Sequence, residues 1–455
     1  MIKNLFSSKI KNNFLKIFLI IFLISLWSAI NTDFESFISN LSNITFRKLL
    51  DVFRFSSPYI FFLIYLILYK RLNFLTKNKF LNFVLLSLLV SFSIQSVGLV
   101  VSGGNINYLH LFFLTFFSFV ILIDAYNFNY EKEVLITAGI LILIYSTIYL
   151  VISYHSFIFK SPQLNLYGNI QNIENYWGIV SDNSPRSSGL SRFALIISAP
   201  LMLKILTEKR PGIAICFFYY LNTTIIMLAQ SRINVSVFFF FMIAIFIFTI
   251  LLKEDFKIII KKIILIIILP PIIYMGTVYL KSNYSDLRSE FTEKNNLSLQ
   301  QQGADATAQL RIQHPTSPLT SGRLEDWKKI IQKNDNIVFG NGLMGDRFLI
   351  NQSASNILIY NYASGGIFSV AVFILLILRS IFVSASLVFI YKIKANKGNI
   401  LIMSSIFIQS YLILRGVAES SFAVFGIDFL IFFTLYLFSE KYYLKASFLK
   451  NNLVK

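Results

Sequence analysis

Charged residues are scarce in this sequence. Asp, Glu, Lys and Arg together make up 14% of the 455 residues, whereas a soluble globular domain usually contains about 25%. Hydrophobic residues reach 56%, phenylalanine alone accounts for 48 residues, and the mean hydropathy is +0.67. Such a surplus is tolerable only where lipid replaces water as the outer solvent. The composition therefore excludes a soluble globular protein and predicts an integral membrane protein.

Residues that build disulfides and metal sites are also rare. The single cysteine, Cys216, lies within an apolar run and excludes a disulfide framework. His110, His155 and His314 are far apart in sequence and show no spacing typical of a metal site. The sequence contains no Walker A phosphate loop and no readable Ser-His-Asp set. We therefore predict no metal, no cofactor and no nucleotide substrate.

Acidic residues are outnumbered by basic ones, and the formal net charge is +19. A basic balance can indicate nucleic-acid binding, but here Lys and Arg lie in short clusters between apolar runs and not on one face of a domain. This distribution excludes nucleic acid as the partner. It is typical of a chain that crosses a membrane many times.

Long apolar runs predict an all-α polytopic membrane protein with about twelve transmembrane helices, because about 20 apolar residues cross a bilayer core. The N-terminal run follows a basic start but has a poor cleavage site, so we expect a retained first helix and not a signal peptide. The expected spans are 14–30, 55–70, 80–101, 108–124, 134–154, 189–206, 211–229, 233–252, 260–280, 366–391, 399–415 and 421–438.

Alternation of basic connections sets the expected orientation. Short connections rich in Lys and Arg stay in the cytoplasm, which places both termini inside. The chain, 1–455, is expected to form one membrane domain with two long outer loops, 155–188 and 281–352. In the larger loop, 281–320 is polar and expected to be mobile, whereas 321–342 predicts a short helix followed by a glycine turn.

The segment SGRLEDWKKIIQKNDNIVFGNG, 321–342, has an amphipathic pattern. Ser321 can cap the helix, and the apolar residues Leu324, Trp327 and Ile331 fall on one side. One interpretation is a helix that only packs at the bilayer surface. The other is that this helix holds Arg323 over a cavity.

Arginines gather near the expected outer face. Arg186 and Arg192 lie at the start of the sixth span, Arg232 in a tight outer turn, Arg323 at the loop helix and Arg415 at the end of the eleventh span. Arginine stays charged and binds phosphate in a fork geometry, so this set could bind the pyrophosphate of a lipid-linked compound. For any single member, contact with lipid headgroups is the ordinary alternative.

Other polar residues occur in or beside the predicted spans. Asp428 and Arg379 lie within spans, where an ionisable residue either serves function or pairs with another span. Glu419 follows Arg415 by four residues, so the two could pair on a helix. The segment NQSASNILIYNYASGGIFS is too polar to face lipid and predicts a helix start beside a polar cavity. We expect this cavity to be lined by Trp327, Ser355, Asn356 and Asn361.

The order of these features resembles that of bacterial O-antigen polymerases and, more distantly, of O-antigen ligases. Such proteins have many spans and two outer loops, the larger of which precedes the last few helices. The stretches SPRSSGLSRF and AQSRINV also resemble family patterns, and the resemblance covers roughly residues 180–440. The matching residues of the larger loop are Arg323, Trp327, the turn NDNIVFGNG with Gly340 and Gly342, Asn356, and Gly365–Gly366.

The resemblance implies glycosyl transfer at the outer face of the bacterial cytoplasmic (inner) membrane. The donor would be a glycan on undecaprenyl pyrophosphate, and the acceptor the non-reducing sugar of another lipid-linked repeat unit. Membrane lipid and a chain-length regulator protein are the other partners to expect. Arg323 would act in catalysis, with Glu419 orienting an arginine or the acceptor hydroxyl. Pyrophosphate would be bound by Arg186, Arg192, Arg232, Arg323 and Arg415.

One departure separates the alternatives. Ligase-like members carry a histidine just before the asparagine of the helix start, where this sequence has Ser355. The departure favours a polymerase over ligase-like glycan transfer and leaves the general base unassigned. A flippase for lipid-linked oligosaccharide is the alternative from another class, but it needs no long ordered outer loop, and the sequence shows no clear internal repeat.

Overall fold

The computed structural model of the chain consists of helices and their connections. It describes residues 79–104, 108–128, 133–144, 187–208, 210–228, 232–251, 256–292, 323–351, 353–391, 399–420 and 426–453, together with Phe422 and scattered positions before residue 79. No strand occurs in these stretches. The prediction of an all-helical protein is confirmed for the described part of the chain.

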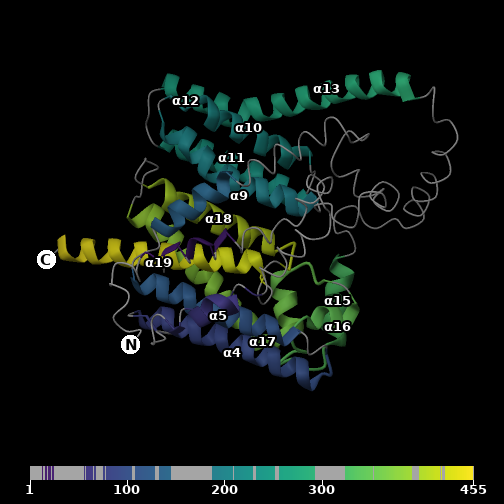
Figure 1. Cartoon of the computed structure of the whole chain (residues 1–455), viewed down its shortest axis with the longest axis vertical. Helices are drawn as coiled ribbons and strands as arrows, with labels where there is room; N and C mark the ends of the chain where they lie inside the picture. The colour runs from purple at the N-terminus through teal and green to yellow at the C-terminus, as the bar shows by residue number, and fades with distance from the viewer. Residues whose placement is uncertain are drawn as a thin grey trace.

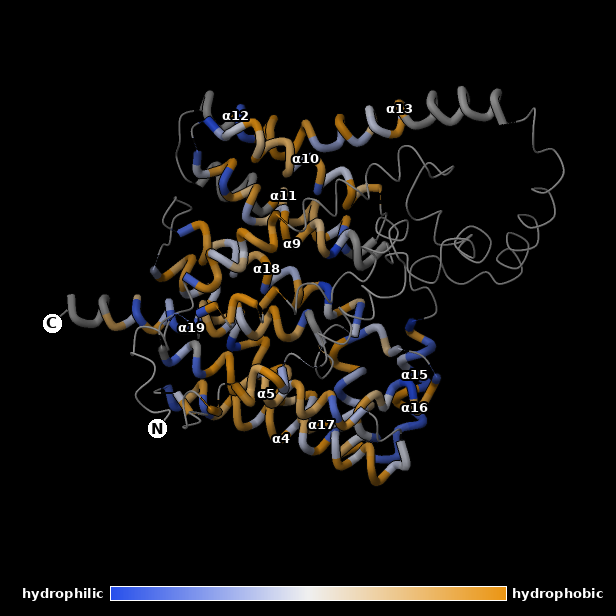
Figure 2. The backbone as a smooth tube through the Cα atoms, viewed as in Figure 1, coloured by the Kyte–Doolittle hydropathy of each residue, from blue (hydrophilic) through white to orange (hydrophobic). Residues whose placement is uncertain are grey.

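Three helices are long and apolar enough to cross a membrane, and they span Lys79–Val101, Ile260–Leu280 and Ile357–Ile390. Shorter apolar helices accompany them, and hydrophobic residues make up most of the helical backbone (Figure 2). Many of their large apolar side chains are exposed on the protein surface. This surface is that of a helical membrane protein, because exposed Leu, Ile and Phe are stable there only against lipid. The number of spans and their orientation stay predictions.

Most of the helices lie side by side in a bundle (Figure 1). α19 lies in the middle of the bundle and contacts α5, α17 and α18, while α9 packs against α10, α11 and α18. The first half of the described helices comprises α4 (Lys79–Val101), α5 (Leu109–Phe128), α9 (Ser187–Thr207), α10 (Ile213–Leu228), α11 (Arg232–Leu251), α12 (Phe256–Ile263), the π-helical turn η3 (Ile264–Ile268) and α13 (Leu269–Thr292). The second half comprises α15 (Arg323–Lys333), α16 (Gly345–Ile350), α17 (Ile357–Ala385), the π-helical turn η4 (Ser386–Ile390), α18 (Ile400–Gly416) and α19 (Ile427–Leu453).

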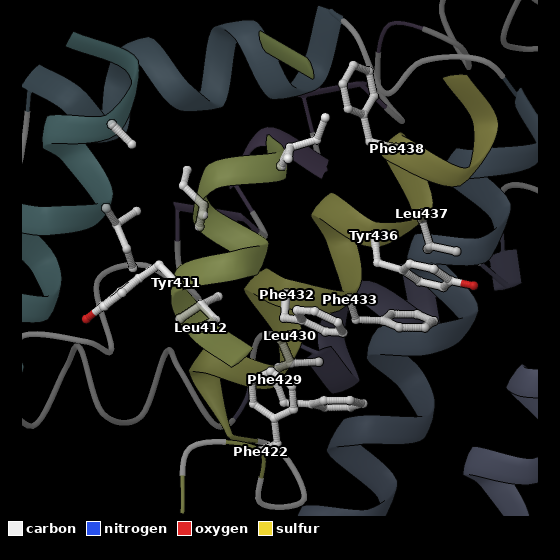
Figure 3. Packing of buried hydrophobic residues seen from close by; sticks show 14 of the residues in the cluster. Tyr411, Leu412, Phe422, Phe429, Leu430, Phe432, Phe433, Tyr436, Leu437 and Phe438 are labelled. Carbon is white, nitrogen blue, oxygen red and sulfur yellow. The ribbon is translucent and has the colours of Figure 1, made fainter. Parts of the chain in front are cut away.

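Aromatic rings fill the centre of this bundle around α19 (Figure 3). Phe433 stacks on Phe119 of α5 at a centroid distance of 4.4 Å, and Phe429 meets Phe92 of α4 edge-on at 5.6 Å. Close packing of this kind holds membrane helices together. Apolar side chains gain no hydrophobic free energy when they move from lipid into the protein core, so van der Waals contacts must supply the stabilisation. The abundance of phenylalanine thus serves the core as well as the lipid surface.

Helix boundaries differ from the expected span limits in three places. α13 continues to Thr292, so the first part of 281–320 is helical, while 293–322 lies outside the described residues. α17 begins at Ile357 and not at 366, because the Asn356 side chain caps it by accepting from the N–H groups of Leu358 and Ile359. α19 begins at Ile427, later than the expected 421. Most of the expected outer loop 155–188 also lies outside the described residues.

α17 is broken at Gly365 and Gly366, and the turn after α15 fills the break. Gly366 has φ 63° and ψ −163°, which is not helical. The turn N–H groups of Asn341 and Gly342 donate to the carbonyls of Ala363 and Ser364 at 2.8 and 2.9 Å. The break therefore leaves these carbonyl groups satisfied, as irregular backbone inside a membrane protein requires.

The same turn packs against the last turn of α4 with no space for a side chain. Gly342 has φ 89°, and a Cβ atom there would lie 2.0 Å from the backbone nitrogen of Leu99. The next N–H, that of Leu343, donates to the Gln95 carbonyl at 2.9 Å. Glycine at 342 is thus required by both conformation and contact.

Replacing Gly342 with alanine is expected to destabilise the protein by about 1–3 kcal/mol through overpacking, with about 1–2 kcal/mol more from the left-handed backbone. The measurement is thermal unfolding of the detergent-solubilised protein. Gly276→Ala in α13 is the matched control, because nothing lies within 4 Å of its Cβ position. Equal unfolding temperatures for the two variants would contradict the close approach of the turn to α4.

Candidate functional site

A buried carboxylate joins two of the predicted arginines at one end of the bundle. Asp428, in the first turn of α19, accepts from Arg192 of α9 at 2.9 Å and forms a second ion pair with Arg415 of α18. The N-terminal turn of a helix favours a negative charge, which suits Asp428 to this place. One side chain therefore ties the distant helix α9 to the consecutive helices α18 and α19.

Burial separates the roles of these three residues. The Asp428 and Arg415 side chains are 1% and 6% exposed, whereas that of Arg192 is 16% exposed. Arg415 is thus nearly enclosed, and Arg192 is the more accessible guanidinium. Of the two interpretations for Asp428, pairing with other helices is what the structure shows.

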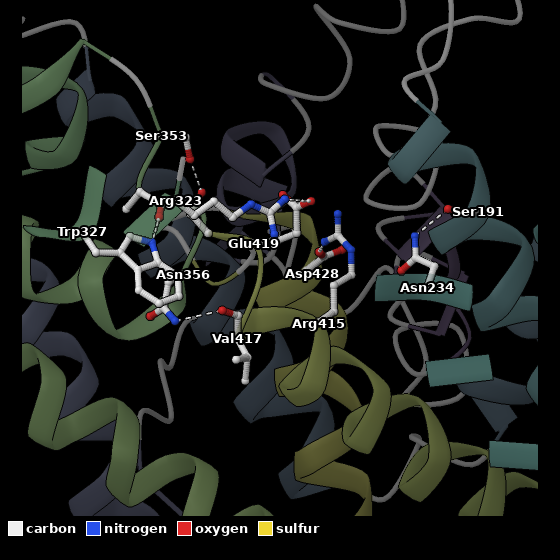
Figure 4. Close-up of polar contacts among 12 residues, drawn as sticks. Ser191, Asn234, Arg323, Trp327, Ser353, Asn356, Arg415, Val417, Glu419 and Asp428 are labelled. Carbon is white, nitrogen blue, oxygen red and sulfur yellow. Dashed lines mark hydrogen bonds and ion pairs between the residues drawn. The ribbon is translucent and has the colours of Figure 1, made fainter. Parts of the chain in front are cut away.

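A second, looser ion pair lies beside the first (Figure 4). Arg323, at the start of α15, lies 4.0 Å from Glu419, and both side chains are partly exposed. The expected pairing of Glu419 with Arg415 on one helix was wrong, because α18 ends at Gly416. Glu419 still lies close enough to Arg415 for their charges to interact. The charged cluster therefore comprises Arg192, Arg323, Arg415, Glu419 and Asp428.

Hydrogen bonds hold α15 to the loop that carries Glu419. Trp327 donates its Nε1–H to the Ala354 carbonyl at 2.6 Å, four residues along the helix from Arg323. Asn356 donates its Nδ2–H to the carbonyl of Val417 at 2.9 Å, two residues before Glu419. The backbone at 354–356 thereby links the two partners of the looser ion pair. Trp327 and Asn356 therefore position the looser ion pair, and their expected place in a cavity lining stays a prediction.

The connection at 353–356 has two further supports. Ser353 and Ser420 share a hydroxyl hydrogen bond at 2.6 Å, and Asp346 of α16 accepts from the Ala354 N–H at 2.8 Å. Burial raises the pKa of the Asp346 carboxyl, and hydrogen bonds from the backbone N–H groups of Ala354 and Arg347 oppose that rise. Asp346 was not predicted from the sequence. Its place just before the polar segment NQSASN could have indicated that its carboxylate accepts a hydrogen bond from that segment.

A chain of three uncharged, hydrogen-bonded side chains lies beside Arg192 and Arg415. Tyr411 of α18 donates to the Asn234 side-chain carbonyl at 2.8 Å, and Asn234 of α11 donates to the hydroxyl of Ser191. Ser191 precedes Arg192, and Tyr411 lies one helical turn before Arg415. These hydrogen bonds therefore hold α9 and α18, which carry the two arginines, to α11. No spacing in the sequence pointed to them, because the three residues come from three separate apolar runs.

The remaining predicted site residues have different positions. Arg186 lies outside the described residues, and Arg232 begins α11 with a side chain whose position is not described. Ser355 has φ 48° in the turn before α17. Asn361 is fully buried and donates to the Ile357 carbonyl of its own helix at 2.7 Å. The structure thus brings together three of the five arginines.

Arg379 lies farther along α17 and belongs to another cluster. Its guanidinium binds Glu440 of α19 at 3.1 and 2.6 Å and lies over the Phe80 ring at 4.6 Å. Asn78 also donates to Glu440, at 3.0 Å. Arg379 therefore pairs with another helix, and Glu440 lies about 18 Å along α19 from Asp428 at 1.5 Å per residue.

Comparison with known proteins adds no family to this description. The sequence matches no protein-family model, and neither curated proteins nor solved structures give a match. Within the described part of the chain, no three His, Cys, Asp or Glu residues are grouped so that they could hold a metal ion. The candidate site is therefore described by the distances, contacts and burial of its own residues.

Proposed function

We propose that this protein polymerises lipid-linked oligosaccharide repeat units at the outer face of the bacterial cytoplasmic membrane. The proposal includes about twelve spans with both termini in the cytoplasm. The observation that supports it most is the charged cluster. Three guanidinium groups and two carboxylates, from four helices and the loop after α18, meet at one end of an apolar bundle, which leaves one positive charge in excess.

The excess charge suits an anionic group that carries a lipid tail. Undecaprenyl pyrophosphate has both properties, because its phosphates can meet Arg192 and Arg323 while its chain stays in the bilayer. The buried Arg415 contributes by pairing with Asp428 and so holding this carboxylate beside Arg192. Arg186 and Arg232 belong to the same proposal as further pyrophosphate ligands.

The reaction is a substitution at the anomeric carbon of the donor sugar. A hydroxyl oxygen at the non-reducing end of the acceptor unit bonds to this carbon, and the bond from the carbon to the pyrophosphate oxygen breaks. Undecaprenyl pyrophosphate leaves with the electron pair, and the hydroxyl proton passes to a base that the described residues do not identify. Guanidinium groups placed where the leaving oxygen becomes negative lower the barrier. Glu419 holds Arg323 for this role.

Arg323→Ala is expected to lower chain extension by about 10²- to 10³-fold, the usual effect of removing one group that stabilises developing charge. The assay is a gel of surface polysaccharide from a host whose chromosomal copy is deleted and replaced by each variant. Arg323→Lys should recover part of the activity, since it keeps the charge and loses the fork. Lys329→Ala, on an exposed position of the same helix, is the matched control.

The deletion strain itself separates the alternatives. Loss of the long ladder with retention of the single-repeat product supports a polymerase. Loss of all attached glycan supports ligase-like transfer or a flippase. A wild-type ladder from Arg323→Ala, at a normal amount of protein in the membrane, would remove Arg323 from the site.

A further inference from the structure

The turn between α15 and α16 carries a large apolar tip that no described helix covers. Ile337, Val338 and Phe339 are 51%, 55% and 52% exposed, although they follow one another in an irregular turn. A surface turn usually carries small and polar residues at its tip. Three consecutive large apolar residues in this position therefore need an apolar partner.

The described hydrogen bonds of this turn are made within the protein, mostly to other backbone groups, while the Phe339 N–H donates to the side-chain oxygen of Asn336 at 3.2 Å. The Ile337 carbonyl accepts from the N–H of Ile367 at 2.9 Å, and the Gly340 N–H donates to Asn336 at 2.8 Å. With the bonds from Asn341, Gly342 and Leu343 to α17 and α4, the turn needs no water at these groups. Irregular backbone can lie at membrane depth only when it is satisfied in this way.

The position of the break in α17 sets the level of the tip. Residues 367–390 form about 36 Å of helix at 1.5 Å per residue, enough to cross a bilayer core of about 30 Å without the segment before the break. Ile337 bonds to Ile367, so the tip lies level with the first turn of this spanning part. On the other side, Gly342 contacts Gly98 and Leu99, in the last turn of α4.

The surface around the tip continues the apolar faces of two candidate membrane spans. Val97 and Val101 of α4 and Ile367 of α17 are all more than half exposed. α4 and the adjoining α17 are hydrophobic over most of their length (Figure 2). Lipid already covers these faces in a helical membrane protein, and the same lipid reaches the tip without a gap.

We propose that residues 337–339 form a re-entrant tip that inserts into the edge of the bilayer hydrocarbon and contacts lipid acyl chains. The tip anchors α15, whose exposed polar residues stay in water, at the membrane surface. This anchoring fixes the height of Arg323 relative to the bilayer. The inference requires only that α4 and α17 span the membrane, and it is independent of glycosyl transfer.

The test measures where position 339 lies in a reconstituted bilayer. The full chain is prepared with Cys216→Ala, which removes its single cysteine, and with Phe339→Cys, which is then spin-labelled. In phosphatidylcholine vesicles, we expect the label at 339 to collide severalfold more with oxygen, which is concentrated in lipid, than with a water-soluble nickel chelate. The order should be reversed for Lys329→Cys of α15, and Leu378→Cys of α17 should show the deepest position.

If the variant at 339 does not purify as a folded protein, a spin label on Val338→Cys provides a second measurement of the depth of the tip. Preferential collision with the nickel chelate at both tip positions would overturn the proposal and place the tip in water. Low collision with both reagents, together with a disulfide between two copies when an added oxidant treats the unlabelled Phe339→Cys variant, would overturn it in favour of an interface between copies of this chain. Loss of polysaccharide extension has no bearing on the result, because the label reports location alone.

Discussion

Asp428→Asn is expected to destabilise the protein by about 3–5 kcal/mol, the usual cost of leaving buried charges without their partner. Asp428 is 1% exposed and is the ion-pair partner of both Arg192 and Arg415. Its loss leaves two guanidinium groups facing each other in a medium that screens their repulsion poorly. The measurement is equilibrium unfolding in mixed micelles of a mild detergent and dodecyl sulfate.

Arg192→Gln is the informative comparison for Asp428. It removes the more exposed arginine and leaves Asp428 and Arg415 as a one-to-one pair, so we expect a smaller loss of stability. The double variant should cost less than the sum of the single variants, because the residues interact directly. Strict additivity would contradict the buried ion pairs. If Arg192 binds pyrophosphate as proposed, Arg192→Gln should also lose chain extension while remaining folded.

Arg379→Met is expected to destabilise the protein by a similar amount, about 3–5 kcal/mol, because it leaves a buried carboxylate without a counter-charge. The Glu440 side chain is 0% exposed and receives two hydrogen bonds from Arg379. Asn78 alone cannot neutralise it. The same unfolding measurement applies, and the variant should be recovered from membranes in a smaller amount.

Arg379→Met combined with Glu440→Gln is the matched control. It removes both charges and keeps an amide that can bond to Asn78, so much of the lost stability should return. A double variant as unstable as Arg379→Met alone would show that the aromatic contacts of Arg379, and not its ion pair, stabilise this end of the bundle. The comparison also separates this effect on stability from the charged cluster, which lies about 18 Å away along α19.

The helices that cross the bundle were the most predictable part of the fold. α4 lies where the run 80–101 predicted a helix, and α9 lies where 189–206 did. Lipid imposes this regularity, since a chain in hydrocarbon must form its hydrogen bonds within one segment. The expected span began at 366, where α17 resumes after its glycine break, whereas the first segment of α17 was predicted only as a helix start beside a polar cavity.

The candidate site was predictable in its residue types and not in its contacts. The sequence indicated arginines near one face, and it also indicated Glu419 and Asp428. It did not indicate that Glu419 meets Arg323 or that Asp428 meets Arg192, because such pairs depend on how separate helices pack. Tyr411, Asn234 and Asp346 were missed for the same reason.

By itself, the sequence determined the solvent of this protein and its helical class, because a chain with so few charges and so many apolar runs can satisfy its backbone in lipid only as helices. Only the tertiary structure decided which charges meet. Arg192 and Asp428 are 236 residues apart, yet they pair at 2.9 Å. It also decided that the glycines of one turn fill a break in another helix. Both outcomes follow from contacts between distant segments, which no local pattern encodes.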